Sequence, residues 1–109
     1  MARYAFRYFF DPGSGICLWP ADEAARARFG AAVDPRGLAL PRGTRERINQ
    51  LVDWYDQSVD WEYPGGPPLW DEGEMDRFAR AARQLLEVIR VQLGPDFEIR
   101  DEVSAPLRT

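Results

Sequence analysis

The chain has 109 residues and a formal net charge of −4, with 18 acidic residues against 14 arginines and no lysine or histidine. This length predicts one domain over residues 1–109, with 104–109 as a frayed tail, and the hydrophobic fraction of 45% is ordinary for a globular protein. The missing histidine and lysine exclude serine–histidine and cysteine–histidine mechanisms, Cys2His2 zinc sites and Schiff-base chemistry within this chain. We therefore expect no metal and no organic cofactor.

The cysteine and hydropathy patterns indicate a compartment. Cys17 is the single cysteine and cannot form an internal disulfide, which is typical of a small buried residue in a reducing compartment. No stretch approaches the roughly 18 apolar residues of a membrane span. Residues 1–10 lack the small-residue cleavage site of a signal peptide. The sequence therefore predicts a cytoplasmic protein without a membrane segment.

Residues 3–19 are predicted to form a β-hairpin. Alternate residues of its first strand, 3–10, are aromatic and fall on one face: Tyr4, Phe6, Tyr8 and Phe10. One proline and two glycines within 11–15 are typical of a five-residue turn, so residues 16–19 are the return strand. Trp19, at the end of that strand, is expected in the core.

Two helices are predicted in the middle of the chain. The run 21–29, rich in alanine and arginine, predicts a short helix that stops at Gly30, and Pro20 suits its first turn. Residues 34–37 have the composition of a type I turn. Thr44 is the expected N-cap of the next helix. The apolar stripe of that helix consists of Ile48, Leu51, Val52 and Tyr55.

The longest helix is predicted over residues 72–93, with Asp71 as its N-cap and Glu74 completing a capping box. The Gly-Pro pair at 94–95 ends it. Its apolar positions recur at helical spacing: Met75, Phe78, Ala79, Ala82, Leu85, Leu86, Ile89 and Leu93. The preceding residues, 61–70, hold three prolines and two glycines and can form neither a helix nor a central strand.

Residues 97–103 alternate as a half-exposed strand, and a strand near each end of the chain favours pairing of the two. The inward positions of this last strand are Phe97, Ile99 and Val103. The charged residues available to face each other across the pair are Arg3, Arg7, Glu98 and Glu102. The sequence thus predicts an α+β fold with a small antiparallel or mixed three-stranded sheet, made of the N-terminal hairpin and the C-terminal strand. About three helices pack on one face of this sheet.

The segment 48–76 carries eight acidic residues and no basic one, and it holds three of the four tryptophans. Carboxylates late in a helix oppose the helix dipole, so local stability does not require them. We interpret this acidic, aromatic segment as a partner-binding surface. Its predicted contact residues are Asp53, Asp56, Asp60, Trp61, Glu62 and Tyr63.

The loop 61–70 has two interpretations. As a binding surface it would present large aromatic side chains that the prolines hold in order. As a lid it would pack Trp61, Leu69 and Trp70 over the ends of two helices. The position of Trp70 beside a helix start favours the lid, whereas the sequence leaves Trp61 and Tyr63 open between the two.

Two classes of function follow. We favour a non-enzymatic interaction domain whose acidic segment binds a basic protein. In size and charge the chain is similar to small acidic bacterial proteins that neutralise toxins, so an immunity-like, antitoxin-like or regulatory role is expected. The negative net charge argues against nucleic acid as the partner, and the oligomeric state is left open.

The alternative is a small carboxylate-dependent enzyme or a ligand-binding domain with a pocket under the 61–70 loop. Its acid and base would come from Asp53, Asp56, Asp60 and Glu62. The two classes differ in whether Asp53, Asp56 and Glu62 converge in a concavity or spread over a convex surface.

Overall fold

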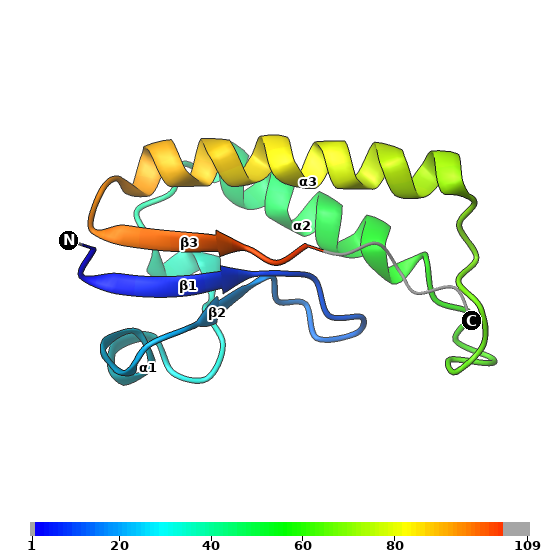
Figure 1. Ribbon diagram of the computed structural model, residues 1–109, viewed down its shortest axis with the longest axis horizontal. Helices are drawn as coiled ribbons and strands as arrows, with labels where there is room; N and C mark the ends of the chain where they lie inside the picture. Colours follow the sequence, from blue (N-terminus) through cyan, green and yellow to red (C-terminus); the bar gives the residue numbers. More distant parts are fainter. Residues whose placement is uncertain (1, 104–109) are drawn as a thin grey trace.

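The computed structural model describes residues 2–103, so the predicted frayed tail 104–109 lies outside the described residues. Three α-helices pack on one side of a three-stranded mixed sheet (Figure 1). The elements in chain order are β1 (Tyr4–Tyr8), β2 (Leu18–Pro20), α1 (Glu23–Phe29), the 3-10 helix η1 (Pro35–Gly37), α2 (Arg42–Asp56), α3 (Glu72–Leu93) and β3 (Phe97–Asp101). The predicted α+β class with a small mixed sheet is confirmed.

Strand β1 is the centre of the sheet, whose order is β2-β1-β3. It runs antiparallel to β2, with Phe6 opposite Pro20, and parallel to β3, with Tyr4 opposite Phe97. Pairing with the C-terminal segment continues past β3, because the Glu102 amide donates to the Tyr8 carbonyl at 3.0 Å. The strands from the two ends of the chain are therefore neighbours, as the sequence predicts.

The core lies between the inner face of the sheet and the helices. All four aromatic residues predicted for one face of the first strand are buried: Tyr4, Phe6, Tyr8 and Phe10. The Tyr8 hydroxyl donates to the Ala82 carbonyl of α3 at 2.9 Å, so this buried polar group is satisfied. The predicted apolar stripes of the two long helices face this core. Their buried members are Ile48, Leu51, Val52 and Tyr55 of α2 and Met75, Phe78, Ala82, Leu85, Leu86 and Ile89 of α3. Packing thus follows the periodicity of the sequence.

Helix α1 begins two residues later than predicted. Pro20 belongs to β2 rather than to the first helical turn, because a proline without an N–H fits an edge strand. The N-cap is Asp22, whose carboxylate accepts from the Ala25 amide at 2.8 Å.

The prediction that Thr44 caps the second helix is wrong. Helix α2 begins at Arg42, and its N-cap is Pro41, which makes no side-chain hydrogen bond. Thr44 is buried, and its hydroxyl donates to Oε1 of Gln92 in α3 at 2.7 Å. A threonine near a helix start can therefore serve the contact between two helices instead of the cap.

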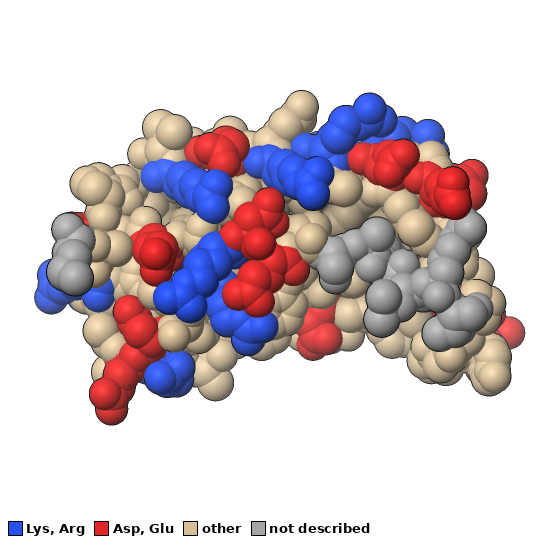
Figure 2. All heavy atoms as spheres, viewed as in Figure 1, with Lys and Arg blue, Asp and Glu red and all other residues tan. Residues whose placement is uncertain are grey.

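The outer face of the sheet, away from the helices, carries side chains of both charges (Figure 2). Trp19 lies on this face and not in the core, so that prediction is wrong. The register is the cause: Tyr8 pairs with Leu18, which turns Leu18 inward and Trp19 outward. Trp19 is half-buried because its ring stacks on Phe9 with centroids 4.9 Å apart.

Candidate partner-binding surface

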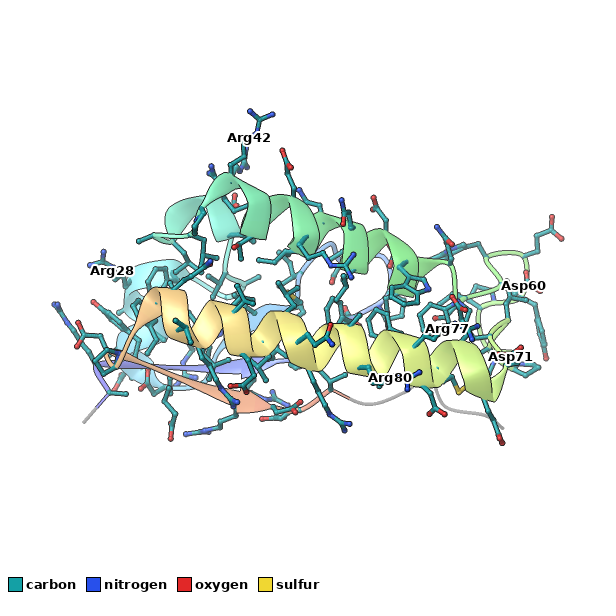
Figure 3. All side chains as sticks on the ribbon, turned by 90° about the horizontal axis from the view of Figure 1, so that it is seen from above. Arg28, Arg42, Asp60, Asp71, Arg77 and Arg80 are labelled. Atoms are coloured by element: carbon teal, nitrogen blue, oxygen red, sulfur yellow. The ribbon has the colours of Figure 1, made fainter. Side chains whose placement is uncertain are left out.

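The predicted contact residues lie where α2 ends and the chain turns back into α3. Helix α2 ends at Asp56 and α3 begins at Glu72, so the loop between them forms one end of a molecule that extends 40 × 23 × 22 Å. Figure 3 shows Asp60 and Asp71 at this end and Arg28 and Arg42 towards the other. We call residues 53–63 the acidic end.

A cluster of aromatic rings holds the loop between α2 and α3 against the core. Trp70 is buried, with its ring 5.2 Å from Phe78 and 5.9 Å from Trp54. The Leu69 amide donates to the Ser58 carbonyl at 2.8 Å, which ties the second half of the loop to the end of α2. The prediction that Trp70 acts as a lid residue is confirmed by its burial.

The rest of the loop presents large apolar side chains to solvent. Trp61 is 56% exposed, Tyr63 66% and Leu69 62%. The question that the sequence leaves open for Trp61 and Tyr63 is thereby answered: neither is part of a lid. A lid interpretation is also wrong for Leu69. Exposed aromatic side chains of this size are typical of surfaces that bind other proteins.

The four predicted carboxylates differ in their surroundings. Asp53 and Glu62 are exposed, and within residues 2–103 no hydrogen bond engages either side chain. Asp56 is half-buried, and its Oδ1 accepts from the Gly13 amide at 3.0 Å. Asp60, also half-buried, accepts from the Glu62 amide at 3.0 Å. Among the described residues none of the four is in an ion pair, so their negative charges face the solvent unneutralised.

The hairpin turn 11–15 also belongs to this end, which sequence reasoning missed. Gly13 donates its amide to Asp56, and a Cβ at Gly13 would lie 3.2 Å from Cη2 of Trp61. More than forty residues separate these partners along the chain. No local pattern in the sequence marks such a contact, because the glycines of 11–15 predict a turn and not the residues that it meets.

One arginine reaches the acidic segment from α3. Arg77 contacts Glu74 at 2.6 Å, and Glu74 also accepts from Nε1 of Trp54 at 2.6 Å. Asp71 caps α3 as predicted, but Glu74 uses its carboxylate for these contacts and no described bond runs from it to the cap amide. Hydrogen bonds from Arg77 and Trp54 lower the pKa of Glu74 below its ordinary value of 4.5.

We expect the Glu74→Gln variant to differ from the wild type in its pH dependence. A lowered folded-state pKa stabilises the fold above the pKa of the unfolded chain, and this contribution is lost as the pH falls through the folded-state value. The wild type should therefore be slightly more stable at pH 7, and the difference should shrink as the pH falls below 4.5 and through the lower folded-state pKa. Urea melts between pH 3 and pH 7 measure this. If the wild type remained more stable than Glu74→Gln by the same amount at pH 3, the contribution of Glu74 would come from its packing on Trp54 and not from its charge.

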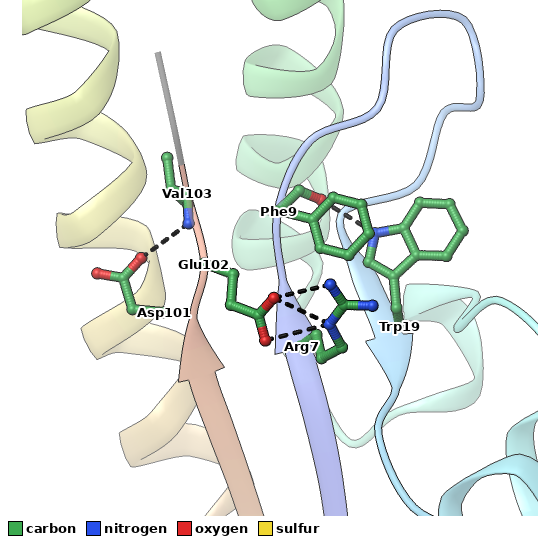
Figure 4. A network of polar contacts seen from close by, with 6 residues as sticks. All are labelled: Arg7, Phe9, Trp19, Asp101, Glu102 and Val103. Atoms are coloured by element: carbon green, nitrogen blue, oxygen red, sulfur yellow. Dashed lines mark hydrogen bonds and ion pairs between the residues drawn. The ribbon is translucent and has the colours of Figure 1, made fainter.

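Charges on the outer face of the sheet are arranged differently from those of the acidic end. Arg7 holds Glu102 through two guanidinium nitrogens at 2.8 and 2.9 Å (Figure 4). Glu98 pairs with Arg100 at 3.3 Å. The predicted contact between the chain ends is confirmed for Arg7 and Glu102. The charges of this face are largely paired, whereas the carboxylates of the acidic end have no ion-pair partner among the described residues.

A groove of about 310 Å³ lies between the start of α2 and the middle of α3. Its lining residues are Gly43, Thr44, Arg47, Ala81, Gln84, Leu85 and Val88. None of the four predicted carboxylates lines it, so it offers no support to a carboxylate-dependent enzyme. Within residues 2–103 no group of three or more Cys, Asp or Glu is placed to hold a metal ion. No helix of this part of the chain has the length and apolar character to cross a membrane.

Comparison with known proteins relates the chain to a family. The search of curated proteins finds no match. Residues 13–100 match the model of a family described as Serratia CdiI immunity protein-like. The matched segment begins in the hairpin turn, contains the whole acidic end, and finishes in β3. Because this match spans well over half of its length, the chain belongs to the Serratia CdiI immunity protein-like family.

Proposed function

We propose that this protein is an immunity protein that neutralises a basic toxin by binding it through the acidic end. The observation that carries the proposal is the family match over residues 13–100, since an immunity protein protects a cell by binding a toxin. The surface is inferred from the structure. It is the end where exposed aromatic side chains lie among carboxylates that have no ion-pair partner within residues 2–103.

Two properties of the acidic end support this choice of surface. Trp61 and Tyr63 offer large, stiff contact area, and residues of these types dominate the binding energy of protein interfaces. Unneutralised carboxylates attract a basic partner and raise the rate of encounter. The aromatic side chains would thus supply affinity, while Asp53, Asp60 and Glu62 would supply steering.

Neutralisation by binding requires no catalysis from this chain, and we propose that it has none. The absence of histidine and lysine from the sequence supports this part of the proposal. We also propose the cytoplasm as its compartment. The supporting observation is Cys17, which is unpaired and buried, with burial raising its thiol pKa to about 12.

The test begins with the toxin. The tagged chain captures its partner from extracts of the cells in which it occurs, and mass spectrometry identifies that partner. The partner counts as the toxin only if its expression arrests growth in cells that lack this chain and not in cells that contain it.

Charge reversal then tests the surface. The variant Asp53→Arg with Glu62→Arg should slow association with the toxin on the order of tenfold at low salt and flatten the salt dependence of the rate. Asp56 is left unchanged because it also holds the hairpin turn. Stopped-flow association rates at two ionic strengths measure the effect, and a denaturant melt should show a stability change within about 1 kcal/mol.

The matched control is Glu23→Arg with Asp96→Arg. It changes the net charge by the same amount, and both residues are exposed with no side-chain bond among the described residues. Glu23 lies in the first turn of α1 and Asp96 in the turn before β3, at the other end of the molecule (Figure 1). Equal association rates in the two double variants would show that the acidic end does not steer the toxin. Failure of any captured protein to arrest growth would contradict the immunity function itself.

A further inference from the structure

We propose that Asp56 is a positioning residue that locks the hairpin turn 11–15 onto Trp61, so that the toxin meets one composite surface built from two distant segments. This inference rests on the proposed function. It changes the role of Asp56 from a steering charge to a structural support of the neighbouring aromatic contact.

The contacts around Asp56 carry the proposal. Its Oδ1 accepts from the Gly13 amide at 3.0 Å, and its backbone carbonyl accepts from Nε1 of Trp61 at 3.1 Å. One residue therefore holds the turn with its side chain and the indole with its backbone. The Trp61 ring in turn lies against Gly13, where an added Cβ would come within 3.2 Å of it. These three residues form a closed set of contacts.

The arrangement fixes an aromatic side chain that would otherwise be mobile. Trp61 is 56% exposed, so the core does not determine where its ring lies. A side chain that is ordered before binding loses less conformational entropy when the partner arrives, and preorganisation of this kind lowers the cost of association. Gly13, with a φ of 81°, gives the turn the backbone conformation and the open space that the ring requires.

The turn also adds charge to the surface. Asp11 is exposed at its start. The pKa of Tyr55 is raised mainly by the burial of its hydroxyl and, to a smaller extent, by the negative charge of Asp11, so Asp11 lies near Tyr55. Ser14 is exposed on the same turn, with its hydroxyl donating to the Asp11 carbonyl at 2.8 Å. The composite surface thus has a fifth carboxylate, from a segment remote in sequence.

Two substitutions at Asp56 distinguish its hydrogen bond to the Gly13 amide from its negative charge. Asp56→Asn removes the charge and keeps an oxygen acceptor for Gly13, whereas Asp56→Ala removes both. In the free protein we expect Asp56→Ala to speed hydrogen exchange at the Gly13 amide by about tenfold and to broaden the Trp61 indole resonance. Asp56→Asn should leave both close to wild type. Against the toxin, Asp56→Ala should weaken binding by about tenfold, mainly through faster dissociation, and Asp56→Asn should not.

Two glycines of the turn provide an independent and matched pair. Gly13 and Gly15 both have positive φ, 81° and 74°, so an alanine strains the backbone at either position. Only at Gly13 does the new Cβ meet Trp61, since nothing lies within 4 Å of a Cβ at Gly15. The Trp61 indole resonance should shift in Gly13→Ala and stay in place in Gly15→Ala. This comparison decides the question even if Asp56→Ala does not fold.

Several outcomes would overturn the positioning role. Equal loss of toxin binding in Asp56→Asn and Asp56→Ala would make the residue a steering charge. Unchanged Gly13 exchange in Asp56→Ala, or an indole resonance that stays in place in Gly13→Ala, would show that the turn and the ring are not coupled. Each result can occur while Asp53→Arg with Glu62→Arg still slows association, so failure of this inference is distinguishable from failure of the proposed function.

Discussion

Replacing Phe78 by alanine is expected to destabilise the fold by about 3–5 kcal/mol. Phe78 is 1% exposed, and its ring lies between 5.0 and 5.2 Å from those of Phe10, Trp54 and Trp70. Alanine would leave a cavity where the hairpin, the end of α2 and the loop before α3 meet. Rigid aromatic rings from three segments cannot collapse into that space without leaving their rotamers.

A urea melt monitored by circular dichroism measures this loss. The control is Val91→Ala on the same helix, where the side chain is 80% exposed and the change should stay within about 0.5 kcal/mol. If Phe78→Ala melted within about 1 kcal/mol of the wild type, the aromatic cluster would not be a tightly packed part of the core.

Truncation of Trp61 is expected to separate binding from folding. Under the proposed function, Trp61→Ala should weaken toxin binding by about 2–4 kcal/mol, which is the range of a central interface aromatic. Its effect on folding should be small because more than half of the side chain is already in solvent. Trp70→Ala should do the reverse and cost about 3–5 kcal/mol of stability, since that ring is buried among Trp54, Tyr55 and Phe78.

Calorimetric titration with the toxin and denaturant melts of both variants provide the two readouts. Wild-type affinity in Trp61→Ala would remove this residue from the interface. A large stability loss in the same variant would mean that the contacts of Trp61 with Gly13 and Asp56 support the fold more than they support binding.

Sequence reasoning was most reliable where one periodicity ran without interruption. The stripe of α3 and the alternation of β1 predicted both elements and their buried faces, because each depends only on neighbouring residues. It failed where a residue type has two uses. The sequence predicts Trp19 in the core, but the strand register turns it to the outer face of the sheet. The sequence predicts Thr44 as a helix N-cap, but its hydroxyl donates to the side chain of Gln92 in α3.

The candidate surface was predicted only as far as it is contiguous in sequence. Residues 53–63 follow one another along the chain, so their charge and aromatic content are visible without a structure. The burial of Trp70 was predicted from its position beside a helix start, whereas the exposure of Trp61 was not, since nothing in the sequence distinguishes a lid from a binding surface at that position. The contact of Asp56 with Gly13 depends on how the hairpin sits against α2, and no local pattern encodes it.

The parallel pairing of β1 with β3 has a consequence for the order of events during synthesis. A ribosome releases β1 well before its partner β3, because α1, α2 and α3 lie between the two strands in the chain, so the central strand waits for one edge of its sheet while these helices are made. During that wait the ring of Phe29 in α1 can already cover Tyr4 and Phe6, at centroid distances of 5.4 and 5.3 Å. Phe97 then completes the same cluster when β3 arrives. Nascent chains would therefore carry a shielded half of the sheet but no finished fold. Under the proposed function, neutralisation of the toxin would lag behind translation by the time needed to close this long-range contact.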